Sequence, residues 1–117
     1  MGRILLRSKI HRATVTMANR DYEGSITIDA ELLKEADIAP YEQVHVVSVD
    51  TGARLITYAI PGYGKEICMN GAAANLIQEG ETVIIMAFCT VPENQVENVS
   101  PILLFLDENN EIKNESP

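Results

Sequence analysis

The stretch "EQVHVVSVDTGARLITYAI" (residues 42–60) decides the fold class, because it contains two strands and the turn that joins them. Apolar residues alternate with polar ones in 42–50, which is the period of a strand with one buried face. Residues 53–60 are again apolar and β-branched, and Thr51-Gly52 between the two segments is a turn dipeptide. We therefore predict a β-hairpin here.

The rest of the chain repeats this pattern of short strands separated by turns. Residues 81–91 form the most apolar stretch, and we expect this strand to be buried on both faces. The spacing of apolar residues in 4–18 favours a strand or a hairpin over a helix. Further strands are expected at 25–28, at the start of 65–77 and at 101–107.

Helices are predicted to be few and short. Asp29 is the expected N-cap of a helix of about two turns over 30–36. A second small helix is expected over the alanines that follow a turn at Asn70-Gly71. The other segments are a loop at 61–64, one helical turn or a loop at 92–100, and a frayed polar tail after Ile112. Many short strands with few helices indicate one mainly β domain over 1–117, a closed β-barrel.

The charge is unevenly distributed along the chain. The net charge is −8, yet residues 1–20 contain basic residues and no acid, and all seventeen acids follow from Asp21 onward. The acidic total argues against nucleic-acid binding. The basic segment has two interpretations, a site for an anion or an acidic surface, or a solvated strand face.

Several classes of protein are excluded by what the sequence lacks. It has no apolar run near the ~20 residues of a membrane helix and no secretory signal, so we expect a cytoplasmic protein with no membrane partner. Cys68 and Cys89 are expected to be reduced, buried thiols. Together with His11 and His45 they lack metal-ligand spacing, so no metal is expected. The "GYGKEI" segment (62–67) lacks the glycines of a phosphate loop.

The dipeptide Gly24-Ser25 in "DYEGSITID" (21–29) raises a chemical question. A serine hydroxyl can attack the carbonyl before it and turn the peptide bond into an ester, and glycine there permits conformations closed to other residues. A donor near that carbonyl would stabilise the developing oxyanion. Elimination and hydrolysis would then break the chain and leave a pyruvoyl group, which acts as an electron sink. On sequence physics alone, Gly-Ser is more often an inert turn.

Five motifs occur together in this chain: "SKIHRATVT" (8–16), "YEGSITID" (22–29), "RLITYAI" (54–60), "NGAAAN" (70–75) and "GETVIIMAF" (80–88). In this order and spacing they resemble the pyruvoyl-dependent aspartate 1-decarboxylase family over residues 1–112. The resemblance implies a double-psi β-barrel that assembles as a homotetramer with active sites between subunits.

The resemblance also implies a reaction. The chain would cleave itself between Gly24 and Ser25 into a β-chain (1–24) and an α-chain (25–117) that begins with a pyruvoyl group derived from Ser25. This cofactor would form a Schiff base with L-aspartate and release CO2 and β-alanine, for pantothenate and coenzyme A biosynthesis. Some relatives need a maturation protein for cleavage. The loop at 61–66 looks about two residues shorter than in many relatives.

Each site residue is assigned by its match to a family motif. Thr57 resembles the hydroxyl donor that polarises the Gly24 carbonyl during cleavage, and Tyr58 resembles the proton donor that quenches the carbanion. Arg54 resembles the ligand of the substrate carboxylate, which a guanidinium can hold with two hydrogen bonds. Without the family context, a strand residue, a packed aromatic and a strand-end charge would be the simpler interpretations.

Six further residues belong to the implied substrate site. Lys9 and His11 share one parity of the first strand and would hold a dicarboxylic substrate, or would otherwise face solvent. Tyr22 would shape the site near the cleavage point. In "NGAAAN", Asn70 would bond the pyruvoyl group or the substrate, and the small side chains of Ala72 and Ala73 would let backbone groups approach.

A second function class stays open at this level. The chain could be an uncleaved, non-catalytic β-barrel that binds an acidic metabolite or a partner chain. The joint presence of Arg54, Thr57 and Tyr58 with the Gly24-Ser25 bond favours the enzyme.

Overall fold

The computed structural model describes residues 1–113, which form a mainly β fold with short helices. Nine strands occur in these residues. They are β1 (Gly2–Thr14), β2 (Met17–Asn19), β3 (Ser25–Asp29), β4 (Gln43–Ser48), β5 (Arg54–Gly62), β6 (Ile67–Asn70), β7 (Thr82–Pro92), β8 (Ile102–Leu106) and β9 (Ile112–Lys113). The helices between them are α1 (Ala30–Ala36), α2 (Ala73–Leu76) and the 3-10 helix η1 (Glu93–Asn98).

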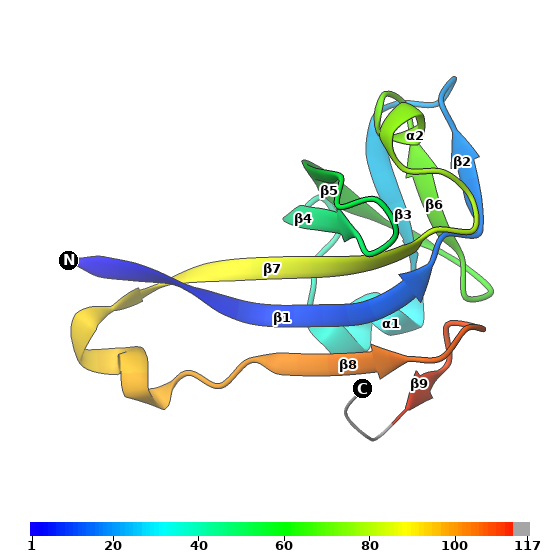
Figure 1. Cartoon of the computed structure of the whole chain (residues 1–117). Coiled ribbons are helices and arrows are strands. Elements are labelled where there is room, and N and C mark those ends of the chain that lie inside the picture. The colour runs from blue at the N-terminus through cyan, green and yellow to red at the C-terminus, as the bar shows by residue number, and fades with distance from the viewer. Residues whose placement is uncertain (114–117) are drawn as a thin grey trace.

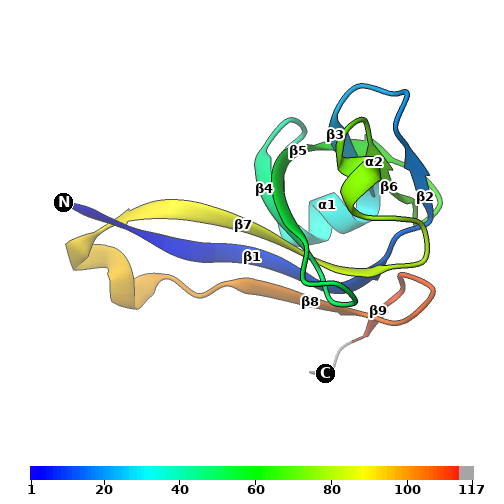
Figure 2. The same cartoon turned by 45° about the horizontal axis from the view of Figure 1, so that its top comes forward.

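The described strands form one sheet in the order β2-β6-β3-β5-β4-β7-β1-β8-β9. Three pairs, β3 with β5, β1 with β8 and β2 with β6, are parallel, whereas the other neighbours are antiparallel. The sheet curls on itself, as Figure 2 shows, and α1 packs against β1, β3, β5 and β8 inside the curve. This mixture of crossed parallel and antiparallel pairs is that of a double-psi β-barrel, as predicted.

A long two-stranded ribbon extends away from the barrel (Figure 1). It consists of β1 and β7, which pair antiparallel from Gly2 opposite Pro92 to Thr14 opposite Thr82. We call this ribbon the arm. The N-terminal end of the arm lies far from α2 and β6 (Figure 1). The molecule therefore has two ends, the arm and the barrel.

The core lies between the curled sheet and α1. Each large aliphatic side chain that folding buries completely contributes about 1.5–3 kcal/mol relative to an exposed one. These side chains come from strands on all sides of the barrel and from α1, which explains why one short helix suffices to fill it. The largest fully buried ones are Ile10, Ile26, Ile28, Leu32, Ile67, Met69, Ile77 and Ile85.

The predicted hairpin at 42–60 is confirmed, with β4 and β5 antiparallel and Val44 opposite Thr57. The segment 4–18 contains β1 and the start of β2, but these strands do not pair with each other, because β2 runs parallel to β6. The predicted helix over 30–36 and the small helix after Gly71 are also present. The proposed fraying of the tail falls largely on 114–117, which lie outside the described residues.

Three local predictions are wrong. Strand β7 is not buried on both faces: Val83, Ile85 and Ala87 are buried while alternate residues are partly or fully exposed, because only one face meets the core. Cys89 is half-buried although it shares the parity of the buried residues of β7, because it pairs with Leu5 on the projecting part of the ribbon and is not part of the core cluster. Cys68 is buried, and both are free thiols. Residues 61–64 are not all loop, because Pro61 and Gly62 continue β5 beside β3.

Asp29 precedes α1 as predicted, yet within residues 1–113 its side chain makes no capping hydrogen bond. Its carboxylate instead accepts a hydrogen bond from the Lys65 backbone N–H at 3.3 Å and lies 4.0 Å from the Lys65 ammonium. The side chain therefore fixes the loop after β5 rather than the helix. The longest α-helix described, α1, has seven residues, and no described helix is long and apolar enough to cross a membrane.

Candidate active site

The Gly24-Ser25 bond lies at the entrance to β3. Gly24 is exposed, whereas Ser25 is only 1% exposed and is the first residue of the strand. A side chain added at Gly24 would meet no described atom within 4 Å, so packing alone does not require glycine here. The bond thus sits between an accessible residue and a buried hydroxyl.

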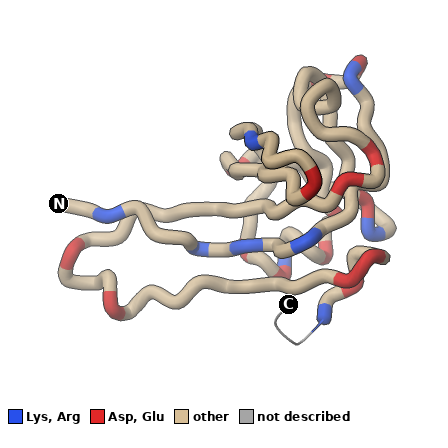
Figure 3. Tube along the Cα trace, in the orientation of Figure 1, with Lys and Arg blue, Asp and Glu red and all other residues tan. Residues whose placement is uncertain are grey.

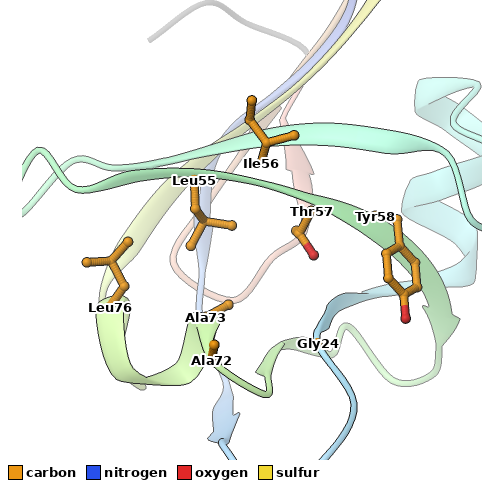
Figure 4. A pocket seen from close by; sticks show the side chains of 8 residues that line it. All are labelled: Gly24, Leu55, Ile56, Thr57, Tyr58, Ala72, Ala73 and Leu76. Carbon is orange, nitrogen blue, oxygen red and sulfur yellow. The ribbon is translucent and has the colours of Figure 1, made fainter.

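A pocket of about 500 Å³ opens beside Gly24 (Figure 4). It is lined by residues 55–58 of β5 on one side and by the start of α2 on the other. Figure 4 shows the Thr57 hydroxyl and the Tyr58 phenol on the side of β5 that faces Gly24. The lining residues are Gly24, Leu55, Ile56, Thr57, Tyr58, Ala72, Ala73 and Leu76.

Five predicted site residues therefore meet in this pocket: Gly24, Thr57, Tyr58, Ala72 and Ala73. The small alanines leave room between α2 and β5, which agrees with the expected close approach. Most of the lining is apolar, so the hydroxyl groups are the main polar contacts for a bound molecule.

Asn70 is not among the residues that line this pocket, but it contacts the serine directly. β3 and β6 are antiparallel with Ser25 opposite Asn70, so both side chains project from the same face of the sheet. The Asn70 amide donates to Ser25 Oγ at 2.9 Å and to Thr27 Oγ1 at 2.9 Å. Ser25 Oγ in turn donates to the Glu23 carbonyl at 3.3 Å. The serine hydroxyl is thus held on both sides before any reaction.

Gly71 is a site residue that the sequence analysis missed. Its φ is +67°, and an added Cβ would lie 2.7 Å from Gly24 Cα and N and 2.9 Å from the Tyr22 carbonyl. Only glycine combines this backbone conformation with so close an approach. The sequence identified a turn at Asn70-Gly71, but nothing in one sequence links that turn to Gly24.

Tyr41 is a second residue that the sequence did not indicate. Its ring stacks on the Tyr58 ring with centroids 6.1 Å apart and an interplanar angle of 30°. Its backbone N–H donates to the Ala59 carbonyl, which ties the loop before β4 to β5. Tyr41 therefore restricts the orientation of the Tyr58 ring.

Four other predicted residues lie elsewhere. Within residues 1–113, Lys9, His11 and Arg54 do not line the pocket: Lys9 and His11 lie on β1, and Arg54 is an exposed residue at the start of β5. Tyr22 lines a neighbouring pocket of about 290 Å³ that also reaches Asn70. The chain thus brings the residues predicted for cleavage into one pocket, whereas Lys9, His11 and Arg54 do not line it.

His11 has a perturbed environment on the arm. Its ring packs edge-on against Phe105 of β8, with centroids 5.7 Å apart. Burial lowers the pKa of His11 from its ordinary value of 6.5, and the positive charges of Lys9, Arg12 and Lys113 lower it further. The imidazole is therefore neutral at pH 7, with basic side chains around it.

Fold and site together define a class: small double-psi β-barrels with a mainly apolar pocket that holds two hydroxyl groups beside a Gly-Ser bond. The family described as "Aspartate decarboxylase" matches residues 1–113, and this chain belongs to that family. The predicted family is thus confirmed.

Relatives of similar length support the same conclusion. The chain is 54% identical to a protein of Clostridium kluyveri over 110 residues, which cover 92% of this chain and 87% of the relative. It is 50% identical to proteins of Phenylobacterium zucineum, with 93% and 94% covered, and of Moorella thermoacetica, with 96% and 89% covered. All three carry the name aspartate 1-decarboxylase.

Proposed function

We propose that this chain is a self-processing enzyme that converts L-aspartate into β-alanine and CO2. Its membership of the aspartate decarboxylase family over residues 1–113 supports this reaction. The observation that carries the self-processing is the Gly24-Ser25 bond, whose serine hydroxyl is buried and held by Asn70 beside a pocket containing Thr57 and Tyr58. A binding barrel has no need for this arrangement.

The proposed cleavage begins with attack of Ser25 Oγ on the Gly24 carbonyl carbon. The C–N bond breaks and the amine takes a proton, which leaves an ester between Gly24 and Ser25. Elimination then transfers the Ser25 Cα proton to water, forms a Cα–Cβ double bond and breaks the Cβ–O bond, which releases 1–24 with a free carboxylate. Water replaces the nitrogen of the dehydroalanine at position 25, ammonia leaves, and the second chain begins with a pyruvoyl group. Thr57, on the pocket side facing Gly24, would donate to the oxyanion.

The surroundings of position 25 fit such a group. An amide donor of Asn70 lies within hydrogen-bond distance of the residue 25 side chain, and the pocket opens at the adjacent Gly24. When formed, the group supplies a ketone that takes up the substrate amine and accepts the electron pair left by CO2. No protein side chain can perform this second task.

The other residues have proposed roles in binding and proton transfer. Tyr58, with its ring restricted by Tyr41, would return a proton to the substrate carbon. Ala72 and Ala73 leave space for the substrate between α2 and β5. Arg54, Lys9 and His11 would hold the two carboxylates. Tyr22 would border the site from the neighbouring pocket.

We further propose that the site is completed between subunits of a homotetramer. The separation of Lys9, His11 and Arg54 from the pocket of their own chain supports this arrangement. Large apolar side chains are also exposed on the arm and on the adjoining β8, as an interface would require. Examples are Ile4 on β1 and Leu103 on β8. The arm of one subunit would then carry cations to the pocket of another.

The test is the intact mass of the purified protein under denaturing conditions. We expect two species, one ending at Gly24 and one beginning with a pyruvoyl group, and β-alanine formation from L-aspartate by the same sample. Incubation with a host-cell extract shows whether a maturation protein is needed. Ser25→Ala should give one uncleaved, inactive chain.

Ser8→Ala is the matched control, because Ser8 is also fully buried on a strand and its hydroxyl has no hydrogen-bond partner among the described residues. It should cleave like the wild type. A single full-length mass for the wild type, even after incubation with extract, would favour an uncleaved barrel that binds an acidic metabolite or a partner.

A further inference from the structure

Four small polar side chains form a buried square on β3 and β6, on the face opposite the barrel core. The strands pair with Ser25 opposite Asn70 and Thr27 opposite Cys68. Alternation along each strand places all four on one face, because successive residues point to opposite sides. Cys68 is 4% exposed and Asn70 is 3% exposed, so water supplies little hydrogen bonding to either.

Every polar group of the Asn70 amide has a partner in this square. The amide nitrogen donates to Ser25 Oγ and Thr27 Oγ1, and the Cys68 thiol donates to Asn70 Oδ1 across 3.1 Å. The Ser25 proton is already used toward the Glu23 carbonyl, so Ser25 Oγ needs a donor and selects this orientation of the amide. Cys68 satisfies the oxygen on the opposite side.

We propose that Cys68 is a positioning residue for cleavage of the Gly24-Ser25 bond, acting through its thiol hydrogen bond to Asn70. This inference rests on the proposed function. The thiol fixes the rotation of the Asn70 amide, so that an N–H group remains aimed at Ser25 Oγ. It also polarises the amide, which strengthens its donor groups, because hydrogen bonds in series reinforce one another.

A fixed donor at Ser25 Oγ assists the first step of cleavage. The oxygen gains negative charge as it loses its proton to attack Gly24, and a donor in place beforehand stabilises that charge without reorganisation. Burial raises the pKa of Cys68, and the negative charge of Glu66 raises it further, so the thiol keeps its proton at neutral pH. Cys68 therefore acts here as a donor and not as a nucleophile.

Removal of the thiol would leave Asn70 Oδ1 buried without a partner. An unsatisfied buried acceptor is unfavourable, so the amide would rotate toward other partners and lose its alignment with Ser25. Serine at position 68 keeps a donor on a γ atom in a side chain of similar size, whereas alanine loses the donor together with the sulfur atom. A normal rate in the serine variant beside a slow rate in the alanine variant therefore points to the hydrogen bond, because the serine hydroxyl also fills less space than the thiol.

The experiment measures the first-order rate of conversion of purified precursor into two chains, by intact mass, with and without host-cell extract. Cys68→Ala should slow cleavage about tenfold, which corresponds to about 1.4 kcal/mol. Cys68→Ser should stay within about threefold of the wild type. Cys89→Ala is the control for loss of a thiol outside the square, on β7, and should cleave at the wild-type rate.

Infrared spectroscopy tests the hydrogen bond without requiring cleavage. In the Cys89→Ala background the S–H stretching band belongs to Cys68 alone. Asn70→Ala should move this band to higher frequency, because the thiol loses its acceptor. An unchanged band would overturn the hydrogen bond itself.

The outcomes separate this inference from the proposed function. Equal rates for Cys68→Ala and the wild type, or equally slow rates for the alanine and serine variants, would overturn the role of Cys68 while self-processing stands. A wild-type chain that stays whole, with or without extract, would overturn the proposed function and with it this role in cleavage.

Discussion

The two ends of the molecule differ in whether their polar side chains are bonded to other described residues of the chain. At the barrel end, formed by β3, β5, β6 and α2, the side chains of Ser25, Thr27 and Asn70 are buried and bonded to one another. On the arm, Lys9 and Arg12 make no ion pair within residues 1–113, and Ile4 is 75% exposed. Figure 3 shows basic segments along β1.

If the site is shared between subunits, as we propose, the contrast indicates which half of it each chain builds by itself. The barrel end has its close contacts and hydrogen bonds within one chain. The arm presents cations and apolar side chains whose complements are not found in the described part of the same chain. Not all of its basic residues are free, since Arg3 pairs with Glu93 and Arg7 pairs with Glu42. Lys9 therefore differs from Arg3 and Arg7, which supports its proposed role in binding an anion.

The largest effect on cleavage is expected at Gly71, where the barrel end leaves no room for a side chain beside Gly24. Gly71→Ala should reduce cleavage below detection, because the new methyl group would lie 2.7 Å from the Gly24 backbone. Gly80→Ala is the matched control: its φ is +90°, but the added methyl meets no described atom within 4 Å. Gly80→Ala should lose about 1 kcal/mol of stability from backbone strain, and Gly71→Ala should lose more because of its added clash, both measured by urea unfolding. Normal cleavage by Gly71→Ala would show that the contact with Gly24 is unimportant.

Tyr58→Phe should separate the two reactions of the barrel end. Cleavage should proceed, while β-alanine formation falls by about 100- to 10,000-fold, the usual contribution of a positioned proton donor. Tyr41→Phe keeps the stacked ring and removes only its own hydroxyl, so it should retain wild-type turnover. Intact mass and a β-alanine assay on the same samples give both readouts. Full activity of Tyr58→Phe would remove the phenol from the mechanism.

A mixing experiment tests whether the arm of one chain serves the barrel end of another. Lys9→Ala and Tyr58→Phe chains, each weakly active, are coexpressed in equal amounts. Random assembly should restore about a quarter of the wild-type activity, because half of the arms and half of the barrel ends are intact. If every site instead used residues of one chain, mixing would restore no activity beyond that of the separate variants.

The smallest expected effect concerns the arm at low pH. The folded chain lowers the pKa of His11, so the unfolded chain binds this proton more readily. The stabilisation is present above the unfolded pKa of about 6.5 and is lost as the pH falls through the lower folded value. The difference in Tm between about pH 7.5 and 5.5 should be smaller for His11→Gln than for the wild type. An equal Tm difference in the variant and the wild type would show that His11 does not contribute to the pH dependence of stability.

The sequence predicted those features that depend on local patterns. Alternation in 42–60 and the turn at Thr51-Gly52 determine the β4–β5 hairpin, and the motif "YEGSITID" contains the bond at which we propose cleavage. The alternating burial of β7 could not be inferred from its composition, because a largely apolar strand can have the same sequence whether one of its faces or both are buried.

The missed features all depend on contacts between segments distant in the chain. The approach of Gly71 to Gly24, the stacking of Tyr41 on Tyr58 and the thiol bond of Cys68 to Asn70 follow from register and loop geometry. A single sequence contains Asn70 and Ser25 but not the pairing that places them opposite each other. Register is a property of the folded sheet.

The position of β1 in the sheet determines how the two proposed fragments stay together. β1 belongs to 1–24, and it lies between β7 and β8, which belong to the other fragment. The shorter fragment therefore contributes the internal strand β1 as well as the edge strand β2, and it can leave only when the sheet opens. After cleavage, refolding becomes a bimolecular association and depends on protein concentration, whereas the precursor refolds as one chain. Cleavage would thus change the basis of stability. The precursor folds reversibly, whereas the cleaved protein would stay native because its two fragments separate slowly.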